Sequence, residues 1–303
     1  MNRRIKILAA LLCLPMVVAG AGLSYLFLAF PKVTQSPPVS LPSDPARIEH
    51  GRYLAENVAM CIECHSVRDW TRYAGPLKES HRGAGGERFM GDFGVLYSPN
   101  ITPSGIGSWS DEQLYTAVAQ GVSAHKGSLF PLMPYPTYGK MAREDLEDIL
   151  AYVRTLKSKD SQVGPSKLNF PLNLLVRTMP AAPDHQPAPP KSDTVAYGRY
   201  LVSIASCNDC HTPKVRGQAV AGMTLAGGFE FQTPWGPVRS ANITPDPATG
   251  IGSWTRTQFI QRFKDPQQRH NRGEEVAQGK FNTMMPWVSY SGMSEEDLGA
   301  MYD

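Results

Sequence analysis

The pattern of apolar and polar positions begins with one long apolar segment at the N-terminus. Residues 7–30 contain no charged side chain, and Arg3, Arg4 and Lys6 precede them. As a helix, this run would be about 36 Å long, enough to cross a hydrocarbon core of about 30 Å. The basic flank would stay on the cytoplasmic side. We therefore predict a signal or membrane anchor over residues 1–31, read as a retained transmembrane helix, with a cleaved export signal as the alternative.

After this segment, helical spacing is clearest at the two ends of a unit of about 110 residues. Asp44-Pro45 is typical of an N-cap followed by proline at the first helical position. Near the other end, apolar residues recur every three or four positions, which predicts one buried helix face. These residues are Leu146, Ile149, Leu150, Val153 and Leu156. Between the two helices the chain is rich in Gly and Pro, so we predict a mainly α fold with a long intervening loop.

This pattern occurs twice, with five motifs in the same order. The pairs are Gly51–Leu54 and Gly198–Leu201, Cys61–His65 and Cys207–His211, Asn100–Pro103 and Asn242–Pro245, Gly105–Trp109 and Gly250–Trp254, and Met133-Pro134 and Met285-Pro286. A tyrosine follows each Met by five positions, at Tyr138 and Tyr290. A period of about 146 residues indicates a duplicated domain rather than a solenoid.

Prolines mark the segments between the units, where they stiffen a spacer and stop a preceding helix. We predict a linker over residues 32–43 and a first domain over residues 44–157. A proline-rich linker over residues 158–192 then leads to a second domain over residues 193–303.

Composition limits the function. The apolar fraction of 42% is enough for a buried core. The net charge of +3 is small, and Lys and Arg are scattered rather than gathered in a stripe, which argues against a nucleic-acid partner. Of the five cysteines, Cys13 lies in the apolar segment and the other four form two pairs.

Both cysteine pairs lie in the pattern C-x-x-C-H, which marks covalent attachment of a c-type haem. Two thiols must each add to a vinyl group of one porphyrin, and the adjacent His can then bind the iron. Alternatives are a zinc site, which needs four clustered ligands, and a redox C-x-x-C motif, which needs neither the His nor a second copy. The predicted haem-binding residues are Cys61, Cys64 and His65 in the first domain and Cys207, Cys210 and His211 in the second.

A methionine is the predicted second axial ligand of each iron. Met133 lies 68 residues after His65, and Met285 lies 74 residues after His211, and a proline follows each Met. Thioether ligation raises the potential of a haem iron. Met284 is the alternative to Met285, but the proline and the later tyrosine keep their register only with Met285.

Two aligned tryptophans and five further histidines complete the set of candidate residues. Trp109 and Trp254 align, and each could donate its ring N–H to a haem carboxylate or pack in the core. The remaining histidines have no counterpart in the other unit, so we expect structural or surface roles for them. They are His50, His81, His125, His185 and His270.

Together, C-x-x-C-H, Asn-Ile-Thr-Pro, Gly-Ile-Gly-x-Trp and Met-Pro-Tyr-Pro resemble the cytochrome c subunits of membrane-bound bacterial alcohol, aldehyde, sorbitol and gluconate dehydrogenases. The resemblance extends from about residue 44 to the end of the chain. It implies tandem class I cytochrome c domains and His/Met ligation. It also implies electron flow from a dehydrogenase toward quinone, another cytochrome or a terminal oxidase. Typical members have three haem domains, whereas two C-x-x-C-H motifs are present here.

We therefore predict an electron-transfer protein of a respiratory chain, not itself an enzyme and with no catalytic residue. Its cofactors would be two covalent haems c, and its donor a periplasmic or membrane-bound dehydrogenase. The expected location is the cytoplasmic membrane, with the haem domains in the periplasm. The alternative is a dihaem enzyme such as a peroxidase or a thiosulfate-oxidising cytochrome. His/Met ligation disfavours it because both axial positions of the iron are filled.

The resemblance also implies that the first and last helices of each domain cross where a glycine lets the backbones approach an aromatic ring. Gly51 and Tyr152 suit this crossing in the first domain. The second domain stops at Asp303, which aligns with Ala151. We therefore expect its final helix to be truncated and Gly198 to lack an aromatic partner.

Overall fold

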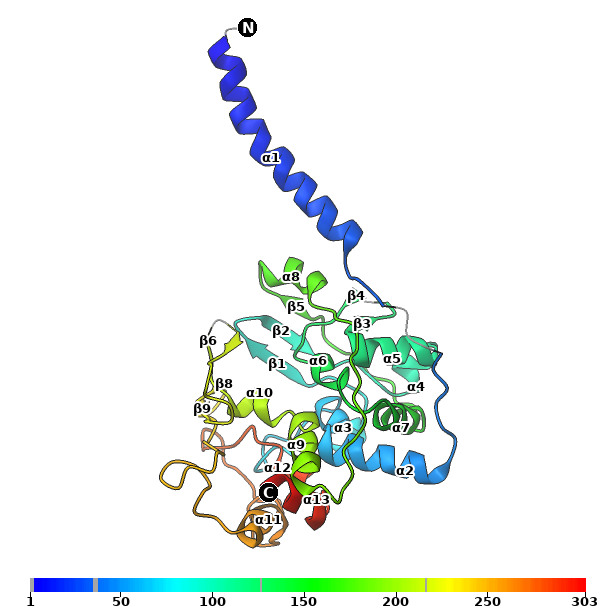
Figure 1. The fold of residues 1–303 in the computed structure, drawn as a ribbon, viewed down its shortest axis with the longest axis vertical. Coiled ribbons are helices and arrows are strands. Elements are labelled where there is room, and N and C mark those ends of the chain that lie inside the picture. Colours follow the sequence, from blue (N-terminus) through cyan, green and yellow to red (C-terminus); the bar gives the residue numbers. More distant parts are fainter. Residues whose placement is uncertain (1–2, 35–37, 126, 216) are drawn as a thin grey trace.

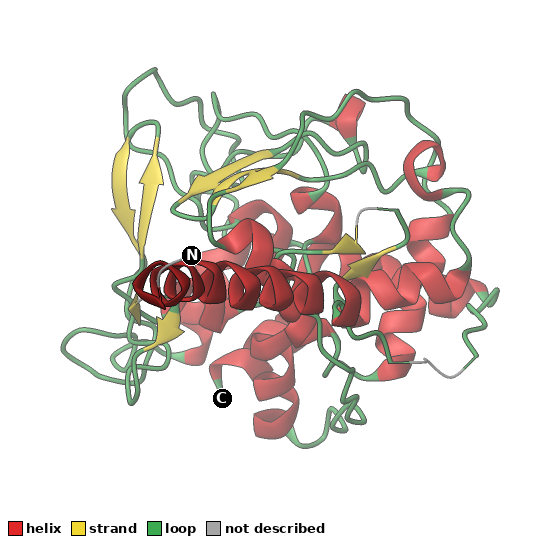
Figure 2. Ribbon diagram, turned by 90° about the horizontal axis from the view of Figure 1, so that it is seen from above, coloured by secondary structure: helices red, strands yellow, loops and turns green. Residues whose placement is uncertain are grey.

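The computed structural model describes residues 3–34, 38–125, 127–215 and 217–303. Helices make up most of the regular structure and lie at the centre, while short strands lie mainly at the periphery (Figure 2). The prediction of a mainly α fold is therefore confirmed. The two repeats form adjacent bodies, with α2 and α7 in one and α9 and α13 in the other (Figure 1).

In the part of the chain that the structure describes, the first repeat and the segment after it contain ten helical elements. They are α2 (Pro45–Tyr53), the π-helical turn η1 (Leu54–Val58), α3 (Cys61–Cys64), the 3-10 turn η2 (Glu79–His81), α4 (Pro103–Ile106), α5 (Asp111–Gln120), α6 (Tyr135–Tyr138), α7 (Arg143–Arg154) and α8 (Leu172–Leu175), followed by the 3-10 turn η3 (Val176–Thr178). The second repeat contains α9 (Thr194–Ile204), α10 (Cys207–His211), α11 (Arg256–Lys264), α12 (Trp287–Ser291) and α13 (Glu295–Tyr302).

The strands are short and antiparallel. The first repeat has β1 (Arg88–Gly91), β2 (Gly94–Tyr97), β3 (Val122–Ser123) and β4 (Gly127–Ser128), and the segment between the repeats has β5 (Lys167–Leu168). The second repeat has β6 (Lys214–Val215), β7 (Gln218–Ala219), β8 (Glu230–Thr233) and β9 (Gly236–Arg239). The hairpins β1–β2 and β8–β9 are equivalent in the two repeats, pairing Arg88 with Tyr97 and Glu230 with Arg239.

The segment between the repeats packs on the first domain. Its strand β5 extends the β1–β2 hairpin to three strands, with Leu168 opposite Gly94. Farther along, the Asp184 N–H donates to the Gly139 carbonyl at 2.7 Å. The residues predicted as a linker are therefore held along the surface of the first domain.

The apolar N-terminal residues form one helix, α1 (Arg3–Ala29), which extends away from the rest of the molecule (Figure 1). The guanidinium of Arg177 donates to the carbonyls of Phe27 at 3.2 Å and Phe30 at 2.5 Å. A cation at the C-terminal end of a helix stabilises its free carbonyls.

The transmembrane reading of residues 1–31 needs correction. Among the described residues, the structure contains no helix with the length and apolar character that a membrane crossing requires. The residues form the expected helix, but its assignment as a membrane anchor is not supported.

The first and last helices of each domain cross at a glycine. A Cβ atom on Gly51 would lie 1.8 Å from the Asp148 carbonyl oxygen on α7, and one on Gly198 would lie 1.7 Å from the Ala300 carbonyl oxygen on α13. Real Cβ atoms do not approach backbone oxygens so closely. The glycines therefore allow helix contacts that any other residue would push apart, and the crossing at Gly198 is present in the second domain.

The end of α13 also has an aromatic contact. The Tyr302 hydroxyl donates to the Trp254 carbonyl at 2.5 Å, and its ring lies 5.7 Å from that of Phe259. In the first domain, the equivalent Trp109 carbonyl accepts from Arg154 at 2.6 Å. Tyr302 thus ties the last helix to the Gly-Ile-Gly-Ser-Trp motif, where the first domain uses an arginine.

We expect Gly51→Ala and Gly198→Ala each to lower the free energy of unfolding of its domain by about 3 kcal/mol or more, because overpacking against backbone cannot be relieved by a rotamer change. Thermal unfolding followed by circular dichroism measures this loss. The control is Gly20→Ala in α1, where a Cβ would meet nothing within 4 Å. Unchanged melting of both crossing variants would contradict the close approach.

Candidate haem sites

Each C-x-x-C-H motif forms a short helical turn that starts at a left-handed residue. Met60 (φ 53°) precedes α3 and Ser206 (φ 55°) precedes α10. The chain bends sharply at these residues as it leaves the first helix of each domain. The four cysteines of the two motifs are free thiols rather than disulfides. Burial raises the pKa of Cys61 and of Cys207 to about 12, so both are protonated at neutral pH.

The two histidines of the motifs are oriented in the same way. Nδ1 of His65 lies 2.8 Å from the Pro99 carbonyl oxygen, and Nδ1 of His211 lies 2.7 Å from the Ala241 carbonyl oxygen. A carbonyl only accepts, so Nδ1 must carry the hydrogen in both rings. Burial lowers the pKa of both imidazoles, which favours their neutral form. Nε2 of each ring therefore has a free lone pair, which a metal ligand requires.

The accepting carbonyls are held by the Asn-Ile-Thr-Pro motifs. The Asn100 side-chain oxygen accepts from the Thr102 N–H at 2.8 Å and from its hydroxyl at 2.7 Å. Asn242 makes the same two bonds to Thr244, at 2.9 and 2.7 Å. This side-chain turn fixes the backbone just after the carbonyl that orients each histidine.

A glycine lets the histidine segment pass close to this turn. The Gly85 N–H donates to the His65 carbonyl at 2.7 Å, and the Gly227 N–H donates to the His211 carbonyl at 2.7 Å. Both glycines have positive φ, +71° and +73°, and a Cβ on either would lie 2.5 Å from the backbone just before the Asn-Ile-Thr-Pro motif, at Pro99 for Gly85 and at Ala241 for Gly227. The backbone carbonyl of each histidine thus has a hydrogen-bond donor. This contact does not displace the carbonyl of Pro99 or Ala241 that accepts from the imidazole.

The two Met-Pro loops also match. Met133 and Met285 are half-buried, and each carbonyl accepts from the N–H two residues later, at 2.7 Å from Tyr135 and 2.8 Å from Trp287. This matched turn supports the register that pairs Met285, rather than Met284, with Met133.

The tyrosine five residues after each Met joins the Met-Pro loop to the cysteine turn. The Tyr138 hydroxyl donates to the Ala59 carbonyl at 2.8 Å, and the Tyr290 hydroxyl donates to the Ala205 carbonyl at 2.7 Å. Each accepting residue lies two positions before the first cysteine of its motif. Both tyrosines are buried. The sequence marked these tyrosines as repeated, but their partners are backbone atoms, for which residue identity gives no signal.

Two aromatic side chains of the first domain have a buried polar group with no hydrogen-bond partner among the described residues. Within the described part of the chain, Trp109 Nε1 and the Tyr135 hydroxyl are buried without a hydrogen-bond partner. A buried donor without an acceptor is costly. The acidic edge of a porphyrin would supply acceptors, so these groups, the free thiols and the oriented imidazoles fit a c-type haem.

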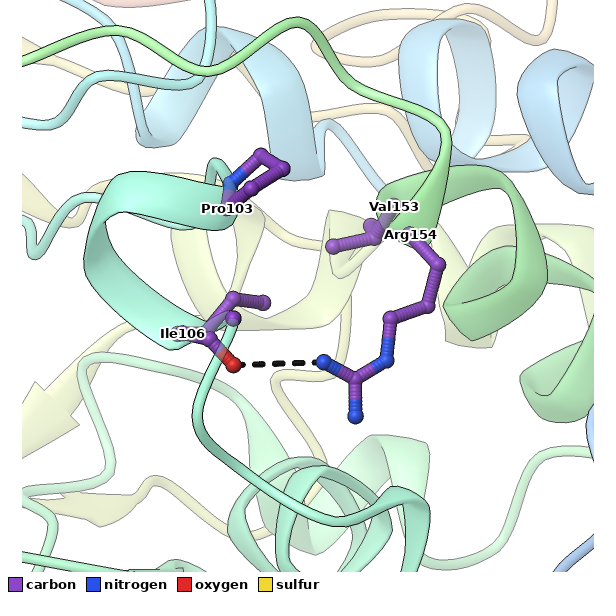
Figure 3. A pocket seen from close by; sticks show the side chains of 5 residues that line it. Pro103, Ile106, Val153 and Arg154 are labelled. Atoms are coloured by element: carbon purple, nitrogen blue, oxygen red, sulfur yellow. Dashed lines mark hydrogen bonds between the residues drawn. The ribbon is translucent and has the colours of Figure 1, made fainter.

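The Trp109 loop is fixed from α7. The Arg154 guanidinium donates to the Ile106 carbonyl at 3.2 Å and to Asp111 at 2.9 Å. It borders a pocket of about 230 Å³ also lined by Pro103, Ile106, Gly107 and Val153 (Figure 3). None of the predicted haem-binding residues lines this pocket, so we assign it to the packing between α4 and α7.

The other described histidines make structural contacts. The His185 ring nitrogens contact the Tyr115 hydroxyl and the Met141 carbonyl, both at 2.5 Å. Nδ1 of His50 lies 3.0 Å from Asp148, and the His125 ring packs edge-on against Trp109. His270 stacks on Trp287 with centroids 5.2 Å apart, and His81 contacts the Ser80 hydroxyl at 2.9 Å.

Comparison with known proteins adds independent support. The chain is 27% identical over 274 residues to the cytochrome c subunit of a quinone-dependent alcohol dehydrogenase from Gluconacetobacter polyoxogenes, covering 86% of this chain and 55% of that protein. It is 31% identical over 272 residues to the fructose dehydrogenase cytochrome subunit of Gluconobacter japonicus, covering 84% and 52%. It is 31% identical over 195 residues to a diheme cytochrome c-type protein of Cereibacter sphaeroides, covering 61% and 63%.

No protein-family model matches the chain. The chain spans about half the length of the dehydrogenase cytochrome subunits that it matches. The similarity covers both repeats, so the resemblance inferred from the motifs is confirmed at the level of homology.

We expect Tyr138→Phe and Tyr290→Phe each to lower the stability of its own domain by about 1–3 kcal/mol, because a buried carbonyl loses its donor. Denaturant unfolding of the separate domain transitions measures the loss. Tyr25→Phe in α1 is the control, because Tyr25 is exposed. Equal stability of all three variants would show that the Met-Pro loops are held by other contacts.

Proposed function

We propose that this homologue of dehydrogenase cytochrome c subunits transfers electrons through two covalently attached c-type haems. The observation that carries the proposal is the repeated set of two free thiols and one histidine whose Nδ1–H is already donated to a backbone carbonyl. The same arrangement at equivalent positions of both repeats indicates two sites of one kind.

The ligand assignment follows from this set. Cys61 and Cys64 would attach one haem and Cys207 and Cys210 the other. His65 and Met133 would bind the first iron, and His211 and Met285 the second. When bound, each haem supplies an iron that alternates between the ferrous and ferric states. The chain itself would attach the ring through the thiols, and it orients each histidine through the Nδ1–H bond to a backbone carbonyl.

Particular hydrogen bonds perform these tasks. The Pro99 and Ala241 carbonyls fix the imidazole tautomer and should make each histidine a stronger donor to iron. The hydroxyls of Tyr138 and Tyr290 hold each Met-Pro loop against the cysteine turn. With both axial positions filled by protein ligands, electron transfer is favoured over catalysis at the iron.

The partners are inferred from the relatives. Their names describe cytochrome subunits of alcohol, fructose and gluconate dehydrogenases. We propose a dehydrogenase as the electron donor of this chain, and quinone, another cytochrome or a terminal oxidase as the acceptor. Co-purification of the untagged dehydrogenase with a tagged copy of this chain tests the donor assignment.

We expect two haems per chain that survive acid–acetone extraction, measured by the pyridine haemochrome assay. The double variants Cys61→Ala/Cys64→Ala and Cys207→Ala/Cys210→Ala should each retain one, because the sites are separate. Cys13→Ala is the matched control and should retain both. A wild-type count of one or none rejects the proposed function.

We expect Met133→His and Met285→His each to lower the potential of one haem and leave the other nearly unchanged, since thioether stabilises ferrous iron relative to imidazole. The weak near-infrared band of sulfur–iron(III) ligation should fall by about half in each variant. Met284→Ala is the control. Loss of that band in Met284→Ala, but not in Met285→Ala, would shift the ligand by one residue.

A further inference from the structure

The Gly-Arg-Tyr-Leu motif of the first domain contacts the second domain. Tyr53, at the end of α2, donates its hydroxyl to the Asp297 carboxylate at 2.6 Å. The same hydroxyl accepts from the Ser294 N–H at 3.0 Å. Ser294 is the N-cap of α13 and Asp297 lies in its first turn. One tyrosine hydroxyl therefore bonds to both the start of the last helix and its acidic residue.

The Gly-Arg-Tyr-Leu motif of the second domain makes the reciprocal contact. Tyr200, on α9, donates its hydroxyl to the Asp145 carboxylate. The hydroxyl accepts from the Ala142 N–H at 3.2 Å. Ala142 is the N-cap of α7 and Asp145 lies in its first turn. We call these two sets of bonds the Tyr–Asp contacts.

The two Tyr–Asp contacts are equivalent in register. Tyr53 and Tyr200 are each the third residue of the repeated motif, and Asp145 and Asp297 each precede the leucine that aligns the last helices. A contact in which residue i of one body meets residue j of the other, and j meets i, defines a two-fold interface. The domains therefore meet as a pseudo-symmetric pair within one chain, with α9 and α13 beside α2 (Figure 1).

The acidic residues of these contacts are removed from water. The Asp297 side chain is 1% exposed and that of Asp145 is 14% exposed. Burial raises the pKa of both tyrosines, which keeps their hydroxyls protonated as donors. A buried carboxylate is stable only when hydrogen-bonded, so separating the domains would leave both without their tyrosine donors.

The first cysteine turn also contacts the second domain. The Glu63 carboxylate, inside the first C-x-x-C-H motif, accepts from the Ser289 hydroxyl on α12 of the second domain. Glu63 also pairs with the buried Arg68 at 2.9 Å. The first cysteine turn thus touches the helix that follows the second Met-Pro motif.

We propose that the Tyr–Asp contacts hold the two domains, each with its cysteine turn, in one fixed arrangement, so that electrons pass between the haems across this interface. The step moves one electron from ferrous iron in one domain to ferric iron in the other and needs no proton or co-reactant. Tyr53 and Tyr200 are then positioning residues. This inference rests on the proposed function, since it requires both haems.

The test compares the wild-type haem-loaded protein with Tyr53→Phe, Tyr200→Phe and the double variant. Pulsed EPR measures the iron–iron distance distribution in the ferric protein, and flash reduction measures the concentration-independent electron-transfer phase. We expect the double variant to broaden the distances and slow this phase by about tenfold or more, because it loses two charge-assisted hydrogen bonds and each is worth about a factor of ten in the population of the closed arrangement. The control is Tyr302→Phe, which removes a hydroxyl bonded within one domain and should change neither.

The haem count and the two midpoint potentials separate the possible outcomes. Two haems with unchanged potentials, together with broader distances and slower transfer, support the positioning role. Wild-type distances and rate in the double variant overturn it while leaving the proposed function intact. Fewer than two haems in the wild-type protein reject the proposed function itself. If the double variant does not load haem, the iron–iron distances of Tyr53→Phe and Tyr200→Phe test the positioning role instead. Because the two contacts are reciprocal, each single variant should change those distances to the same extent.

Discussion

The close crossing of the first and last helices is the constraint on which the rest of each domain depends. Gly51 lets α2 approach the backbone of α7, and Gly198 does the same for α9 and α13. Each first helix leads into a cysteine turn, and each last helix follows a Met-Pro loop, so the crossing brings opposite ends of the domain together. The hydroxyls of Tyr138 and Tyr290 then join each Met-Pro loop to the backbone just before the cysteine turn.

Sequence patterns predicted the parts of the sites that depend on side-chain identity. The cysteine and histidine positions, the repeated tyrosines and the helical ends were all visible, because each needs a particular residue type. The orienting carbonyls of Pro99 and Ala241 were not visible, because any residue carries a carbonyl. The Tyr–Asp contacts were also missed, although Tyr53 and Tyr200 were marked by the repeat, because their partners lie about 240 and 55 residues away.

The end of the second domain shows that the two domains make one equivalent contact with different side chains. Counting residues suggested that Gly198 had lost its aromatic partner, since no counterpart of Tyr152 is present. The crossing depends on backbone approach at Ala300, which the aligned residues retain. The carbonyl that Arg154 satisfies in the first domain is satisfied by Tyr302 in the second. Both domains therefore have a hydrogen-bond donor to this carbonyl, although the donor is Arg154 in one and Tyr302 in the other.

Equal ligand sets do not make the two sites electrostatically equal. Between the cysteines of the first motif lies Glu63, whose side chain is 5% exposed and pairs with Arg68, which is 8% exposed. At the same position of the second motif, Asp209 is 50% exposed and lies 3.6 Å from Lys214. Water screens the second pair far more than the first, so substituting either partner of the first would leave a buried charge beside one site alone. If each motif binds a haem, the two irons thus have the same ligands but different local electrostatic fields. Such a difference allows two haems of one chemical type to differ in potential.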